Sequence, residues 1–108
     1  GARAVIPVLP VTDTLKTVDA SGAVVGTPRR SDMVAVQTPQ GFRWDVLIRA
    51  HEAGASLGAD EAAAATDDAG LVEAIGGSVQ TVAGDELSLK VTRPLDLAIA
   101  RLLANAQA

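Results

Sequence analysis

The chain has 108 residues, which is the size of one small domain with a single core. It contains no cysteine, which excludes disulfides, thiolate catalysis and cysteine-ligated metals and suits a reducing compartment. The net charge of -4 argues against a general nucleic-acid binder, and the longest apolar run, residues 4–9, is far shorter than the ~20 residues that span a bilayer. We therefore expect a cytoplasmic protein with no nucleic-acid or membrane partner.

The first third of the chain is rich in signals for β-structure. Residues 4–11 are aliphatic with little alternation, which predicts a strand buried on both faces of a sheet. Two short segments, 15–18 and 23–26, flank the turn-forming residues 19–22, and we interpret them as the two strands of a projecting β-hairpin. Residues 33–38 return as a further strand.

Two helices are predicted in the middle of the chain. Residues 45–55 carry apolar side chains at helical spacing, and Gly54 falls where a C-terminal stop is expected. A second helix is predicted over 69–75, with residues 66–68 as its cap and Gly76-Gly77 as its end.

Strand and helix signals alternate again towards the C-terminus. Residues 79–82 and 87–91 predict two further strands, and Pro94 suits the first turn of a closing helix over 93–105. Alternation of strands with helices indicates an α/β fold.

Three polar clusters are candidates for binding anions: Asp13-Thr14 with Lys16, Arg29-Arg30, and Lys90 with Thr92-Arg93. Arg30 can place two donors on phosphate oxygens, and Lys90 leads into a helix N-terminus, where free N–H groups attract anions. Solvated side chains and surface salt bridges are the ordinary alternatives. Within Thr66-Asp67-Asp68, the two carboxylates could approach a metal or a sugar hydroxyl, but we favour a helix cap. His51 has no evident partner, and we assign it no function.

Four motifs occur in series along the chain: PVTDTLK at 10–16, VQTPQGF at 36–42, TDDA at 66–69 and LKVTRPLDL at 89–97. In this order they resemble the methylerythritol phosphate cytidylyltransferase family of the non-mevalonate isoprenoid pathway. The resemblance covers nearly the whole chain and implies a Rossmann-like nucleotidyltransferase fold. It also implies transfer of CMP from CTP to 2-C-methyl-D-erythritol 4-phosphate, with Mg²⁺ as cofactor and diphosphate as the released product.

The same resemblance implies roles for four residues. Thr14 and Arg30 are similar to the family's contacts with the substrate phosphate, with Arg29 as a rival for Arg30. Thr66 is similar to another substrate contact. Lys90 is similar to the basic residue that stabilises charge at the reacting phosphates, which makes it the candidate catalytic residue. No residue of the chain is assigned to the metal.

The resemblance further implies a homodimer in which the hairpin, about residues 12–33, is an arm that completes the partner's active site. The family's glycine-rich CTP-binding loop has no counterpart in residues 1–108. We therefore expect the chain to be the C-terminal half of a cytidylyltransferase domain, inactive when isolated. The alternatives are a ribitol 5-phosphate cytidylyltransferase, whose motifs are similar, and a non-catalytic dimerisation module.

Overall fold

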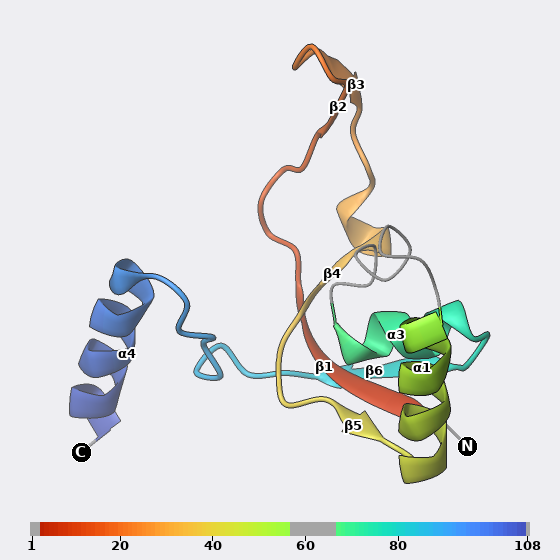
Figure 1. The fold of residues 1–108 in the computed structure, drawn as a ribbon. Coiled ribbons are helices and arrows are strands. Elements are labelled where there is room, and N and C mark those ends of the chain that lie inside the picture. Colours follow the sequence, from red (N-terminus) through yellow and green to blue (C-terminus); the bar gives the residue numbers. More distant parts are fainter. Residues whose placement is uncertain (1–2, 57–66, 108) are drawn as a thin grey trace. The chain divides into compact units, whose positions relative to one another are not determined.

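The computed structural model describes residues 3–56 and 67–107, and these residues form a mixture of strands and helices (Figure 1). In chain order the elements are β1 (Ala4–Pro10), β2 (Thr17–Val18), β3 (Val24–Gly26), the 3-10 helix η1 (Arg30–Asp32), β4 (Val34–Val36), β5 (Gly41–Phe42), α1 (Trp44–Ser56), α3 (Asp68–Ala74), β6 (Val79–Ala83) and α4 (Pro94–Gln107). The predicted α/β class is therefore confirmed. The described residues divide into two compact units, one within Gly1–Pro7 and Thr38–Ala83 and the other within Val8–Gln37 and Gly84–Ala108.

The first unit is built on the beginning of β1. This part of β1 pairs antiparallel with β5, in the register Ala4 to Phe42 and Val5 to Gly41, and β6 also pairs with β1. α1 and α3 pack against each other, and both bury apolar residues at helical spacing. The resulting core consists of Ala4, Val46, Ala50 and Val72, with Phe42, Leu71 and Val79 packed against it.

α1 spans Trp44–Ser56 and so agrees with the helix predicted over 45–55, but Gly54, expected as its C-terminal stop, lies inside the helix. A Cβ at Gly54 would lie only 3.0 Å from the Leu71 side chain of α3. This glycine therefore permits a close approach between two helices rather than a left-handed helix end.

The predicted signals around α3 are confirmed. Asp67 is the N-cap, and its side chain accepts a hydrogen bond of 2.8 Å from the Gly70 backbone N–H. At the other end Gly76 adopts a φ of 76°, the left-handed conformation that glycine reaches without a Cβ clash. Both ends of this short helix are thus fixed by local residue chemistry.

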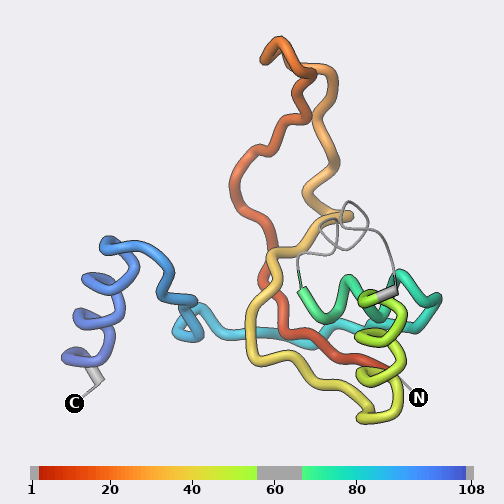
Figure 2. The backbone as a smooth tube through the Cα atoms, in the orientation of Figure 1, coloured from red at the N-terminus to blue at the C-terminus, as the bar shows by residue number. Residues whose placement is uncertain are grey.

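The second unit contains the predicted hairpin. The tube in Figure 2 shows the chain leaving β1, forming β2 and β3 and returning to β4. β2 pairs antiparallel with β3, and the Asp19 carboxylate closes their turn by accepting the backbone N–H groups of Ser21 and Ala23. β4 pairs antiparallel with the later part of β1, with Val8 opposite Val36.

The strand predicted over 87–91 is wrong, because this segment contains no regular secondary structure. Instead, Asp85 forms a turn: its carboxylate accepts the Leu87 N–H at 2.8 Å, and its carbonyl accepts the Ser88 N–H at 2.9 Å. Local side-chain bonds of this kind compete with strand pairing. The helix that follows begins at Pro94, as expected.

Candidate functional site

Arg30 and the loop that carries Thr14 are brought together within the second unit. Nη1 of Arg30 donates a hydrogen bond of 2.8 Å to the carbonyl oxygen of Thr12, two residues before Thr14. Both predicted binding residues are exposed. Arg29, the rival candidate, instead makes an exposed ion pair of 3.5 Å with Asp32. Arg30, and not Arg29, therefore lies against the loop that carries Thr14, and its predicted role in binding stays a prediction.

Lys16, the cation of the same cluster, contributes to the hairpin instead. Its Nζ donates a hydrogen bond of 2.8 Å to the hydroxyl of Thr27, which lies just after β3. This bond joins the chain entering the hairpin to the chain leaving it. The Lys16 side chain thus stabilises the stem of the hairpin.

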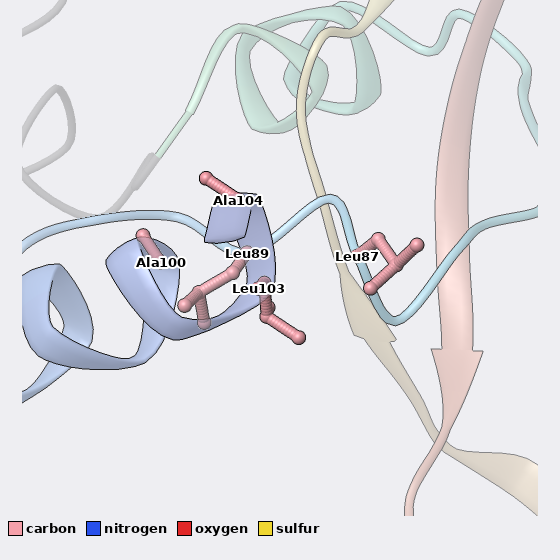
Figure 3. A pocket seen from close by; sticks show the side chains of 5 residues that line it. All are labelled: Leu87, Leu89, Ala100, Leu103 and Ala104. Carbon is pink, nitrogen blue, oxygen red and sulfur yellow. The ribbon is translucent and has the colours of Figure 1, made fainter. Parts of the chain in front are cut away.

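Lys90 is exposed and lies on the irregular segment between β6 and α4. Ahead of it, the side-chain amide of Gln37 binds the backbone of Asp85 and Ser88. Leu87 and Leu89 line an apolar hollow of about 220 Å³ together with Ala100, Leu103 and Ala104 of α4, and of the two leucines Leu89 lies beside the helix (Figure 3). The segment that presents Lys90 is therefore anchored although it is not a strand.

The start of α4, just after Lys90, is held by Asp96. One carboxylate oxygen of Asp96 accepts the backbone N–H groups of Thr92 and Arg93, at 3.2 and 3.1 Å, and the Thr92 hydroxyl at 3.0 Å. The Thr92 backbone and hydroxyl donors, more than the adjacent Arg93, lower the pKa of this carboxyl group. The backbone N–H groups of Thr92 and Arg93 are thus bound to Asp96 and do not bind an anion. An anion near this helix start would therefore be bound by the Lys90 side chain.

A second hollow, of about 310 Å³, lies within the first unit and is lined by Thr38, Gln40, Phe42, Asp67 and Asp68. Nε2 of Gln40 donates a hydrogen bond of 3.0 Å to Asp67. Nε2 of His51 lies 2.9 Å from Oδ1 of Asp68, so the expectation that this histidine has no partner is wrong. The residue before Asp67, Thr66, lies outside the described residues, and its predicted role stays a prediction.

Sequence reasoning proposed Thr14, Arg30 and Lys90, whose roles stay predictions, and it did not indicate the residues that hold their segments in place. Across residues 3–56 and 67–107, no hydrogen bond or ion pair joins Lys90 to either of the other two. Gln37 lies within a recognised motif, yet no pattern indicated its contact with a segment 48 residues away. Asp96 did carry a signal, because a carboxylate three residues after a helix cap is typical of a capping box.

In the described part of the chain, no three His, Cys, Asp or Glu side chains are grouped so that they could hold a metal ion. None of the described helices is long and apolar enough to cross a membrane.

Comparison with known proteins adds to this geometry. A family model described as 2-C-methyl-D-erythritol 4-phosphate cytidylyltransferase matches residues 1–105. A protein of that name from Rhodococcus opacus (strain B4) is 54% identical over 97% of this chain and 43% of its own length. A crystal structure of the Thermus thermophilus cytidylyltransferase of the same name is 39% identical, with a TM-score of 0.75 over 96% of this chain and 49% of that chain.

A second solved structure, the 4-diphosphocytidyl-2C-methyl-D-erythritol synthase from Anaerococcus prevotii DSM 20548, gives a TM-score of 0.79 at 27% identity. It is matched by 96% of this chain and over 47% of its own length. The chain therefore spans less than half the length of each of these relatives.

Proposed function

Since the chain belongs to the 2-C-methyl-D-erythritol 4-phosphate cytidylyltransferase family, we propose that it supplies part of the active site of such an enzyme. The reaction is transfer of CMP from CTP to 2-C-methyl-D-erythritol 4-phosphate, with release of diphosphate. The observation that carries this proposal is the family match over residues 1–105. The contact between Arg30 and the Thr12 carbonyl supports it, because it holds Arg30 against the loop that carries Thr14.

In this proposal the chain is the C-terminal half of the cytidylyltransferase domain, and the CTP-binding loop belongs to the other half. The hairpin, about residues 12–33, is the arm of a homodimer and reaches the active site of the partner. The exposed valines of the hairpin, Val18, Val24 and Val25, support a role in association, because an apolar surface gains by being covered. We expect the enzyme to act in the cytoplasm.

The transfer requires positioning and charge neutralisation more than acid–base groups. A phosphate oxygen of the substrate attacks the α-phosphorus of CTP, the bond between the α- and β-phosphates breaks, and diphosphate leaves. Thr14 and Arg30 bind the substrate phosphate, Thr66 makes another contact with the substrate, and Lys90 stabilises the charge that develops at the reacting phosphates. Mg²⁺ is proposed as the cation that accompanies CTP, and no residue of this chain is assigned to it.

The proposal is tested with the polypeptide that the complete gene encodes, whether or not it extends beyond residues 1–108. Diphosphate release from CTP and Mg²⁺ is measured in parallel with 2-C-methyl-D-erythritol 4-phosphate and with ribitol 5-phosphate. We expect release with the first substrate only. Release with ribitol 5-phosphate alone would identify the other cytidylyltransferase, and release with neither would favour a non-catalytic dimerisation module.

Replacement of the proposed catalytic residue gives the sharpest prediction for this reaction. Lys90→Ala should cost roughly 2–4 kcal/mol of transition-state stabilisation, measured as a fall in kcat/KM, because one preorganised positive charge is lost. The side chain is exposed, so the fold should be retained. Near-normal turnover would remove Lys90 from the site.

The shared site predicts complementation between two inactive variants. If Arg30 acts across the dimer, each hybrid of an Arg30→Ala chain with a Lys90→Ala chain contains one intact site. We expect part of the activity to return on mixing the two proteins. If the mixture stays inactive although the subunits exchange, the site is not shared between subunits.

A further inference from the structure

Lys90 lies on a segment without regular secondary structure. The position of its ammonium group therefore depends on the contacts that hold this segment in place. From the contacts described below, we infer that Gln37 is a positioning residue for Lys90 in the cytidylyl transfer. The inference rests on the proposed function of Lys90. It assigns a task to a motif residue that contacts neither substrate nor reacting atoms.

The side-chain amide of Gln37 binds the segment ahead of Lys90 with both of its ends. Nε2 donates to the carbonyl oxygens of Asp85, at 2.8 Å, and Ser88, at 3.4 Å, while Oε1 accepts the Asp85 N–H at 3.1 Å. A primary amide carries a donor and an acceptor side by side, so it can replace the backbone of a neighbouring strand. Gln37 directly follows β4, so its amide joins the end of that strand to the segment ahead of Lys90.

The packing at Gly84 shows how closely the segment approaches this amide. The Gly84 N–H donates a hydrogen bond of 2.8 Å to the carbonyl oxygen of Val8 in β1. A Cβ at position 84 would collide with the side-chain oxygen of Gln37 and would lie 3.0 Å from the Val8 carbonyl oxygen. The segment is therefore bound at its beginning to a strand and to Gln37, with no room for an additional side chain.

Beyond Ser88, two further contacts surround Lys90. Leu89 lies against α4 in the hollow of Figure 3, and Thr92 is hydrogen-bonded to Asp96. The backbone on both sides of Lys90 is thus fixed while its side chain remains exposed. Loss of the Gln37 amide would release the backbone before Lys90, at Asp85 and Ser88, and would leave the contacts after Lys90 intact. Charge stabilisation in catalysis is sensitive to displacements of ~1 Å, so kcat should respond to such a change.

The test uses the polypeptide of the complete gene with the substitution Gln37→Met, which keeps the length of the side chain and removes its hydrogen bonds. We expect kcat for diphosphate release to fall roughly tenfold, while the KM for CTP changes less than about twofold. Gly84→Ala, which leaves the amide present but displaces it, should lower kcat in the same way. The matched control is Gln80→Met, the same replacement at an exposed position of β6, and it should leave kcat unchanged.

A double variant separates positioning of Lys90 from general damage to the fold. In a Lys90→Ala background, Gln37→Met should cause no further fall in kcat, because the group that it positions is already gone. Amide hydrogen exchange gives a readout that does not need activity. The Asp85 N–H should exchange faster in Gln37→Met than in the unsubstituted protein, and it should not change in Gln80→Met.

An undiminished kcat in Gln37→Met, or a further full fall in the Lys90→Ala background, would overturn the positioning role. Unchanged exchange at Asp85 would overturn the anchoring contact itself. Failure of the proposed function is distinguished from these outcomes by the unsubstituted polypeptide, which would then release no diphosphate with either sugar phosphate. In that case the positioning role falls with it, and the exchange experiment alone decides whether Gln37 anchors the segment.

Discussion

The two long helices, α1 and α4, have nearly the same length, 13 and 14 residues, but they are stabilised in different ways. α1 buries Val46 and Ala50 completely against α3 and β1. In α4, by contrast, Leu95 and Leu102 are 65% and 70% exposed, and Asp96 is the one buried residue among its described side chains. The first helix is thus held by apolar packing, whereas the second is held at its start by hydrogen bonds to a carboxylate.

The two regions should differ in how much a substitution lowers the free energy of unfolding. In a packed core the loss of a methyl group removes burial and leaves a cavity, so the free energy of unfolding falls. At an exposed apolar position neither cost applies. Substitutions in the α1–α3 core should therefore have larger effects than equivalent substitutions in α4.

The largest effect is expected for Val72→Ala in α3. Val72 is fully buried, and its side chain packs in the core with Val46 and Ala50. We expect a loss of roughly 2 kcal/mol in the free energy of unfolding, measured by urea denaturation. Val91→Ala removes the same two methyl groups at a position that is 49% exposed, and it should cost far less. Equal losses for the two variants would contradict the assignment of the core to the first unit.

A smaller effect is expected for Asp67→Ala at the start of α3. The carboxylate caps the Gly70 N–H and also accepts a hydrogen bond from Gln40, so its removal should cost about 1 kcal/mol in the free energy of unfolding. Asp68→Ala is the matched control, because it breaks only the exposed pair with His51. A larger loss for Asp68→Ala than for Asp67→Ala would show that the histidine pair, not the cap, fixes this helix.

Features determined by neighbours in sequence were predicted correctly. The Asp67 cap, the left-handed Gly76 and the start of α4 at Pro94 all depend on residues within one turn of each other. The hairpin was predictable for the same reason, since Asp19 closes its turn with N–H groups two and four residues away. Local chemistry of this kind is visible in a single sequence.

The features that were missed depend on contacts between distant residues. Gly54 lies inside α1 because a helix distant in sequence passes close to it. Residues 87–91 alternate apolar and polar side chains as a strand does, but the Gln37 amide binds the Ser88 carbonyl and the Asp85 carboxylate binds the Leu87 N–H instead. His51 and Asp68 are 17 residues apart, so neither motif spacing nor helical period could pair them. The sequence could therefore propose candidate site residues, but it could not indicate the distant contacts that support their segments.

A still smaller effect, confined to the first turn of α4, should follow protonation of Asp96. Hydrogen bonds from Thr92 lower the pKa of this carboxyl group in the folded state. The stabilisation is therefore complete above the ordinary pKa of aspartate and is lost as the pH falls through the lower folded-state value. NMR shifts of the Thr92 and Arg93 amides should report this titration below about pH 4. Asp96→Asn should abolish the titration, and an unchanged profile in that variant would assign it to another group.

The smallest effect is expected for Leu102→Ala in α4. Because the side chain is 70% exposed, the substitution should change the free energy of unfolding of the 108-residue chain by less than about 0.5 kcal/mol. The same substitution in the polypeptide of the complete gene then tests whether the contrast between α1 and α4 persists. A loss there approaching that of Val72→Ala would mean that α4 is covered by residues beyond this chain or by a second copy. A negligible loss in both proteins would mean that α4 depends on its Asp96 contacts rather than on apolar packing.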